Sequence, residues 1–253
     1  MKNCKPVINA YADCLRDIAD QDYIAARVLY RYELDHPSLW CALQAVEKYL
    51  KAILLYNRRD VRKIGHDIEK GLKLVKDITD LNFTVPHDVK DFVKYLNAFG
   101  QDRYLVQEFV VPEDYLSRLD KTVWYIRRYC YYLRGEKDGV DMLPYNLKRI
   151  NDSRFLKEPW KYEFPPGHGG YLEEVKEKDL PSKEGLLWNN NYFAVPKRER
   201  VSFKKRILIK KSPLELHPEC LKALKNLICI PKKHKKVKIE LYKANSYEKT
   251  KPS

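Results

Sequence analysis

The feature that most constrains the fold is a helical repeat of apolar residues in the N-terminal half of the chain. Five apolar residues recur there at spacings of three and four: Leu39, Leu43, Val46, Leu50 and Ile53. This spacing places them on one face of a helix. The pattern predicts a helix over about residues 38–56, and Ser38 is a residue type favoured as an N-cap. Such a helix needs partners that cover its apolar face.

The partners are predicted on both sides of this segment. A second apolar repeat indicates a long helix over about residues 112–133. Weaker patterns indicate an opening helix near residues 7–32 and two shorter ones near 67–78 and 88–98. Five helices joined by short connections fold most simply as an antiparallel up-and-down bundle. The predicted fold class is therefore mostly α, with a helical bundle as its main part.

The character of the chain changes after Arg134. Residues 135–196 contain six prolines and six glycines and show no sustained helical period, which is typical of an irregular region. Near the C-terminus, residues 201–209 and 237–241 alternate like strands and residues 218–228 are helix-like, which indicates a small basic α+β module or tail. We therefore expect three parts: a bundle over 1–138, an irregular Pro/Gly/aromatic region over 139–196, and the basic module or tail over 197–253.

Positive charge is concentrated in this last part. The formal net charge is +14, yet residues 1–140 contribute only +2 (23 basic minus 21 acidic side chains). Residues 197–253 contribute +13 (18 minus 5). Four of the lysines stand in one short run: Lys232, Lys233, Lys235 and Lys236. Such density suits a polyanion such as RNA or DNA, and a solvated, solubilising tail explains it equally well.

The sequence also indicates where the protein works and what it does not bind. No segment has the length and apolarity of a membrane span, and the N-terminus lacks the apolar run of a signal peptide. We expect a cytoplasmic protein without a membrane partner. The six cysteines show no paired short spacing, and no histidine has a ligand-like neighbour at a fixed spacing. We therefore assign no metal and no cofactor.

Three stretches of the N-terminal half carry a resemblance to a known family. They run from Asp22 to Leu29, from Ala45 to Leu55 and from Gly65 to Ile68. The second stretch, followed closely by a His-Asp pair at a predicted helix start, is similar to the HEPN family of helical domains. Together with the last predicted bundle helix, the resemblance spans roughly residues 20–134, about half of the chain.

The resemblance implies a function and a candidate site. Active members of the family are ribonucleases that need no metal, and their signature is an Arg followed after four to six residues by a His. Here six residues separate Arg59 from His66, the long end of that spacing. The family also implies a homodimer in which two such sites meet, and a role as a toxin or in defence.

The residue types of this signature suit RNA cleavage by the 2′-hydroxyl of the RNA itself. Imidazole titrates near neutral pH, so His66 is the candidate general base. A guanidinium stabilises the charge that develops on the phosphorane, which is the candidate role of Arg59. Further candidate contacts to nucleic acid are Arg62 in the same loop and the neighbouring Arg103 and Tyr104, a cation beside a ring that stacks on bases.

A non-catalytic function remains open at this point. Relatives that lack the Arg keep the His-Asp pair, in which the aspartate caps the helix and the histidine packs locally. The loop around Arg59 is rich in arginine, so an Arg at an allowed spacing arises easily by chance. The alternative is a HEPN module that binds a nucleotide, a nucleic acid or a nucleotidyltransferase-like partner protein.

Overall fold

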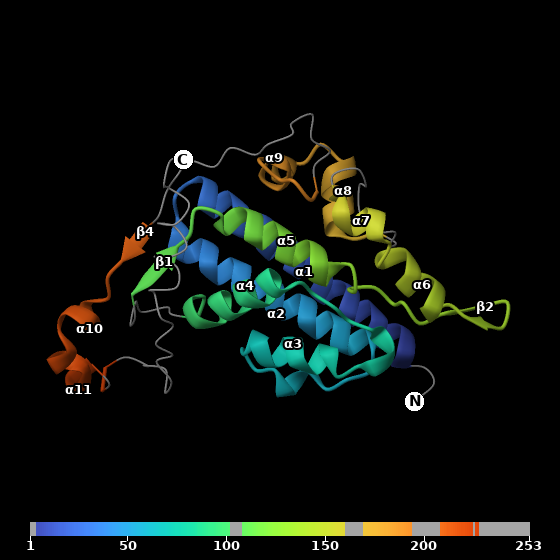
Figure 1. Ribbon diagram of the computed structural model, residues 1–253, viewed down its shortest axis with the longest axis horizontal. Coiled ribbons are helices and arrows are strands. Elements are labelled where there is room, and N and C mark those ends of the chain that lie inside the picture. Colours follow the sequence, from blue (N-terminus) through green and yellow to red (C-terminus); the bar gives the residue numbers. More distant parts are fainter. Residues whose placement is uncertain (1–3, 102–107, 160–168, 194–207, 225, 228–253) are drawn as a thin grey trace, which may run out of the picture.

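The computed structural model of the chain describes residues 4–101, 108–159, 169–193, 208–224 and 226–227. Two long helices form its centre, α1 (Cys4–Arg31) and α2 (Asp35–Tyr56), and a tight turn joins them into a hairpin. Three shorter helices complete a bundle around this hairpin: α3 (Ile68–Lys76), α4 (His87–Phe99) and α5 (Tyr115–Arg127). The bundle is visible in Figure 1. The predicted mostly α bundle is confirmed.

The start of α2 differs from the prediction. The helix begins at Asp35, so Ser38 lies inside its first turn and is not the N-cap. Pro37 fits this turn because the first N–H groups of a helix have no partner within the helix. The buried Ser38 hydroxyl donates instead to the Ala26 carbonyl oxygen of α1 at 2.8 Å and lies 3.0 Å from the Tyr115 hydroxyl of α5. It ties three helices together.

The end of α5 also differs. The apolar repeat predicts a helix to about residue 133, whereas α5 ends at Arg127. The N–H groups of Tyr129 and Cys130 bond to carbonyl oxygens three residues earlier, which tightens and ends the helix. The side chains of Tyr129 and Cys130 are nevertheless fully buried. The apolar repeat therefore predicts the buried positions correctly even beyond the end of α5.

Short helices occupy much of the region whose composition indicates irregular structure. A small hairpin of β2 (Glu136–Lys137) and β3 (Val140–Asp141) comes first. Four helices follow: α6 (Leu143–Ile150), α7 (Ser153–Lys157), α8 (Tyr171–Glu177) and α9 (Pro181–Leu187). Each has eight residues or fewer, too few to display a helical period in the sequence.

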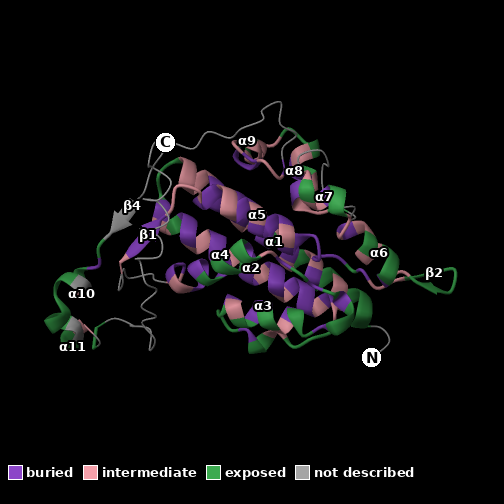
Figure 2. Cartoon of the chain, viewed as in Figure 1, coloured by how far each residue is buried: buried purple, intermediate pink, exposed green. Residues whose placement is uncertain are grey.

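Helices α8 and α9 pack on α1 (Figure 1). Their apolar residues Leu172, Val175 and Leu186 belong to the same buried cluster as the bundle core, and Figure 2 shows this burial continuing into α8 and α9. Gly185 permits the close approach, because a Cβ at this position would lie 2.5 Å from Cγ2 of Val28. The division of the chain at residue 138 stays a prediction. A test of it has to show whether the bundle folds without the contacts of α8 and α9.

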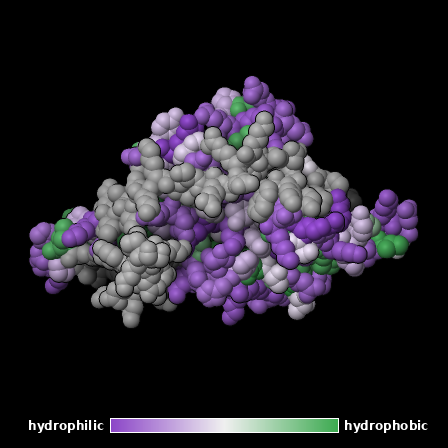
Figure 3. All heavy atoms as spheres, turned by 45° about the horizontal axis from the view of Figure 1, so that its top comes forward, coloured by the Kyte–Doolittle hydropathy of each residue, from purple (hydrophilic) through white to green (hydrophobic). Residues whose placement is uncertain are grey.

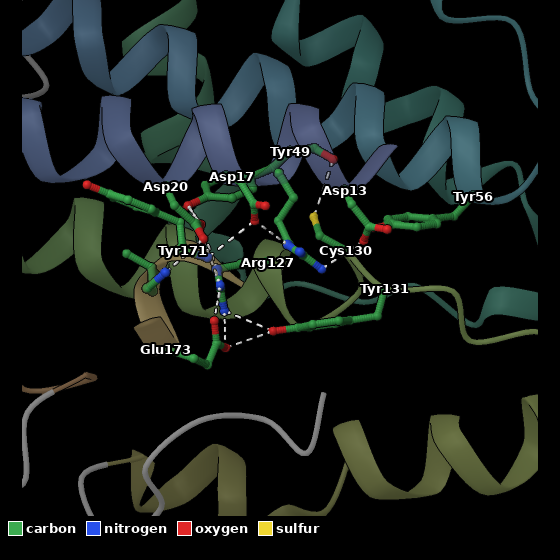
Figure 4. Close-up of polar contacts among 12 residues, drawn as sticks. Asp13, Asp17, Asp20, Tyr49, Tyr56, Arg127, Cys130, Tyr131, Tyr171 and Glu173 are labelled. Atoms are coloured by element: carbon green, nitrogen blue, oxygen red, sulfur yellow. Dashed lines mark hydrogen bonds and ion pairs between the residues drawn. The ribbon is translucent and has the colours of Figure 1, made fainter. Parts of the chain in front are cut away.

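A charged layer also joins α8 to the bundle (Figure 4). Arg127 of α5 donates to Asp20 of α1 through Nε at 2.7 Å and Nη2 at 2.8 Å, and to Glu173 of α8 at 2.8 and 2.6 Å. The Tyr49 hydroxyl donates to Asp20 at 2.6 Å. Burial alone would raise the pKa of Glu173, but the Arg127 charge and its hydrogen bonds lower that pKa to about 2. We call Asp20, Arg127 and Glu173 the buried ionic layer.

The C-terminal part is described only in pieces. Strand β1 (Phe109–Val111) pairs antiparallel with β4 (Leu208–Lys210), with Phe109 opposite Lys210. Two short α-helices and a 3-10 turn follow: α10 (Pro213–Leu216), Pro218–Cys220 and α11 (Leu221–Leu224). The second predicted strand, near residues 237–241, lies outside the described residues. Within the described ranges, every helix is too short or too polar to cross a membrane.

Candidate active site

The candidate site lies in the loop that connects α2 to α3, residues 57–67. The loop leaves α2 with Arg58 in a left-handed conformation (φ 57°) and continues through a 3-10 turn, Val61–Lys63. Gly65 has a φ of 59°, which glycine adopts without a steric cost. Asp67 then caps α3, because its carboxylate accepts the Lys70 N–H at 3.1 Å. His66 is thereby placed just before the start of α3.

The His66 imidazole is exposed yet held by a buried carboxylate. Its side chain is 71% exposed, and its Nδ1 lies 3.1 Å from Oε2 of Glu47, whose side chain is 5% exposed. The other oxygen of Glu47 accepts a hydrogen bond from Lys51 Nζ at 2.6 Å. Because an ionised carboxylate only accepts hydrogen bonds, the contact favours the tautomer with the proton on Nδ1. The Nε2 lone pair of His66 then remains available for a proton.

Helix α4 fixes the backbone on which His66 stands. Gln101, just after α4, donates through Nε2 to the His66 carbonyl oxygen at 2.6 Å. Asn97 of α4 accepts the Ile68 N–H at 3.0 Å and donates to Asp67 at 3.2 Å and to Glu69 at 2.9 Å. These bonds span the start of α3. The imidazole is therefore positioned from two sides, by α2 through its ring and by α4 through its main chain.

Arg59 is exposed, and its charge acts on Asp80 beyond the end of α3. The ion pair with Arg134 is the main cause of a lowered pKa of Asp80, and the Arg59 charge contributes to it as well. Asp80 follows the C-terminus of α3, a helix of nine residues and about 13 Å. Among the described residues, no hydrogen bond or ion pair joins Arg59 to His66. The predicted cooperation of Arg59 with His66 therefore stays a prediction.

The other arginines of the loop have partners within the chain. Arg62 forms a two-pronged ion pair with Asp60, with both N–O distances at 3.0 Å, and this pair lowers the pKa of Asp60. Arg58 donates to the Asn9 side chain of α1 at 2.7 Å and lies over the Tyr132 ring. Arg62 remains exposed, so its predicted contact with nucleic acid stays a prediction.

The remaining predicted contacts cannot be placed. Six residues lie outside the described part of the chain: Arg103, Tyr104, Lys232, Lys233, Lys235 and Lys236. The structure instead adds residues that sequence reasoning did not single out, above all Glu47. Glu47 lies within the Ala45–Leu55 stretch that carries the family resemblance. It is, however, 19 positions from His66 in the sequence. No spacing rule connects two residues that far apart.

The fold and this site define a mostly helical domain with an exposed histidine oriented by a buried carboxylate. Residues 12–122 match the family model described as HEPN domain. This part of the chain, which contains most of the bundle and the whole candidate site, belongs to the HEPN family. Membership indicates a role related to nucleotides or RNA. No curated protein and no solved structure matches the chain.

Proposed function

We propose that the protein is a metal-independent endoribonuclease of the HEPN type, with His66 as its general base. The observation that carries the proposal is the contact between Glu47 and the Nδ1 of His66. It combines an exposed imidazole with a buried carboxylate that sets its tautomer, the arrangement that a histidine base needs. The family match of residues 12–122 agrees with an RNA substrate.

The proposed reaction is an internal transfer within the RNA chain. His66 Nε2 takes the proton of a 2′-hydroxyl, and the 2′-oxygen attacks the adjacent phosphorus. The bond from phosphorus to the 5′-oxygen breaks, and that oxygen takes up a proton. The products are a 2′,3′-cyclic phosphate and a 5′-hydroxyl end, so neither water nor an oxidant is consumed. Negative charge develops on the phosphorane oxygens, where a guanidinium stabilises it.

We further propose that this guanidinium, Arg59, acts across a homodimer. An arrangement of two loops around a shared axis would bring Arg59 of one protomer to the other protomer's site. The basic segment 197–253, with Lys232, Lys233, Lys235 and Lys236, is proposed to add affinity for RNA through its charge. A role as a toxin or in defence is the proposed biological setting.

The test is cleavage of varied RNA by the purified protein, with and without a chelator. We expect equal cleavage in both conditions and cyclic phosphate ends. His66→Ala should reduce the rate by about 10² to 10⁴-fold and Arg59→Ala by about 10² to 10³-fold. The matched control is Lys63→Ala, which removes an exposed charge from the same loop. Arg58 is a poor control because it packs on α1.

Two results would contradict the proposal. Equal losses from Arg59→Ala and Lys63→Ala would mean that the loop only attracts RNA by its charge. Intact RNA under both conditions would favour a second function, a non-catalytic HEPN module that binds a nucleotide, a nucleic acid or a nucleotidyltransferase-like partner. The placement of Arg59 near Asp80 favours this second function, since it gives Arg59 a role within its own protomer.

A further inference from the structure

A face of the bundle next to His66 carries an unusual set of lysines. Five exposed lysines lie on α3 and α4: Lys70, Lys73, Lys76, Lys90 and Lys94. The two helices pack side by side, with Asn97 of α4 bonded to the start of α3. We call these five residues the α3–α4 lysine face. The carboxylates in and directly after α3 are Glu69, which accepts from Asn97, and Asp77.

These lysines differ from most other cations of the bundle in having no carboxylate partner. Lys48, Lys51 and Lys121 pair with carboxylates at 2.5 to 2.6 Å. In the described part of the chain, no ion pair includes any lysine of the α3–α4 face. Instead, Lys76 and Lys90 face each other, and partial desolvation together with the Lys90 charge lowers the pKa of Lys76. The chain thus places two like charges together without compensation.

The position of Lys90 in its helix adds to the unfavourable electrostatic energy of the Lys76–Lys90 pair. Lys73 and Lys76 stand in the last turn of α3, where cations are favourable, but Lys90 stands in the first turn of α4, where the helix dipole opposes a cation. Two carboxylates lie near the first turn of α4, but both have other partners and do not offset the charge of Lys90. Asp88 pairs with Lys121 at 2.5 Å and Asp91 with His87 at 2.8 Å. An anion from outside the protein would offset the repulsion.

We propose that the α3–α4 lysine face binds the phosphate backbone of a single-stranded nucleic acid that leads to His66. The packing of α3 against α4 fixes which part of the lysine face lies next to His66. Gln101 contacts His66 at one end, and Lys76 meets Lys90 at the other. The nine residues of α3 cover about 13 Å, enough for up to about four phosphates of a strand with a rise of ~3.4 Å per nucleotide. The choice of RNA rests on the proposed function.

The experiment measures how the affinity of the full chain depends on salt. The probe is a short single-stranded oligonucleotide with 2′-O-methyl groups, which cannot be cleaved, so the result is independent of catalysis. Each neutralised phosphate contributes about 0.7 to the slope of log affinity against log salt for a single strand. The triple variant Lys73→Gln, Lys76→Gln, Lys90→Gln should therefore lower the slope by roughly 2.

A matched control removes three exposed lysines from another part of the molecule, Lys137, Lys148 and Lys157. They lie on the β2–β3 hairpin, α6 and α7, away from α3 in Figure 1. This variant has the same net charge as the first and should keep the wild-type slope. Equal slope changes in both variants, or an unchanged slope in the α3–α4 variant, would overturn the proposal.

A third arm separates nucleic acid from an acidic protein partner. A polyglutamate peptide of similar charge is titrated in place of the oligonucleotide. Binding of the peptide that depends on the α3–α4 lysines, without binding of the oligonucleotide, would also overturn the proposal. The thermal midpoints of both variants serve as a folding control, and removing the repulsion between Lys76 and Lys90 should leave the α3–α4 variant at least as stable as the wild type.

Discussion

The α2–α3 loop and the buried ionic layer are both rich in charge, yet the charges of the layer are buried and paired whereas those of the candidate site are exposed. In the buried layer, Arg127 is 1% exposed and bonds to two carboxylates, Asp20 and Glu173. In the loop, Arg59 and His66 are exposed, and only the imidazole has a buried partner, Glu47. Charge that holds the fold together is satisfied within the chain. Charge that acts on a ligand must keep a free donor or acceptor.

The outer surface agrees with this distinction. On the face shown in Figure 3 the described residues are mostly hydrophilic, and hydrophobic ones form small separate patches. Small patches of this kind are normal on a soluble protein. On this face, polar and charged side chains therefore offer more to a ligand than apolar ones.

Ending the chain at residue 138 should have the largest effect, because it removes α9 and also α8, which carries Glu173 of the buried ionic layer. Burial of Leu172, Val175 and Leu186 stabilises the fold by ~1.5 to 3 kcal/mol for each side chain. The loss is then roughly 5 to 9 kcal/mol, against a total stability of about 5 to 15 kcal/mol for a typical domain. We expect the fragment 1–138 to keep a helical circular dichroism spectrum but to unfold at much lower denaturant.

Two outcomes would revise this picture of the fragment. A random-coil spectrum would show that residues 139–253 are indispensable to the same core, against the predicted division of the chain. A stability equal to that of the whole protein would show that α8 and α9 contribute nothing to the bundle.

Replacing Arg127 by leucine should cost about 3 to 5 kcal/mol of unfolding free energy, because Asp20 is left buried without its cation. Denaturant unfolding of the full chain measures the loss. Glu173→Gln provides a milder comparison, since it keeps the Arg127–Asp20 pair. A loss below about 1 kcal/mol for Arg127→Leu would mean that the layer behaves like a surface ion pair.

Acid should weaken the protein through Glu173. Its folded-state pKa is lowered from 4.5 to about 2, a difference worth roughly 3 kcal/mol. This stability is fully present above pH 4.5, the usual pKa of the group, and is lost as the pH falls toward 2. Denaturant midpoints between pH 5 and 2 should fall less steeply for Glu173→Gln than for the wild type. Identical profiles would contradict the lowered pKa.

Arg59→Ala should have the smallest effect on stability, within about 0.5 kcal/mol, because its side chain is exposed. The same change should remove most of the proposed cleavage activity. Thermal unfolding and cleavage are measured on one preparation. A destabilisation of more than ~1 kcal/mol would place Arg59 with the structural charges and not with the loop's functional ones.

The bundle was predictable because its helices repeat an apolar face over enough residues to show a period. The N-cap of α3 by Asp67 was also predictable, since it depends on residues that are neighbours in the sequence. Helices α8 and α9 were not, because seven residues each display no period. Their contacts are long-range: Glu173 meets a residue 46 positions away. The sequence therefore cannot show that Arg127 is buried or which carboxylates it meets.

The candidate site was half predictable for the same reason. His66 and Arg59 lie in a local motif, and the motif is recognisable in one sequence. Glu47 belongs to the site because α2 packs against the start of α3, so only the structure places it against His66.

The proposed role of His66 as a base requires Glu47 to hold the proton on Nδ1 and leave Nε2 free, so the tautomer of His66 is the decisive observation. Nitrogen NMR of the intact protein with labelled histidine reports which ring nitrogen carries the proton, and His66→Ala identifies the signal. We expect the Nδ1–H form in the wild type and a shift toward the Nε2–H form in Glu47→Ala. The same tautomer ratio in both proteins would contradict the account, since Glu47 would then not orient the imidazole.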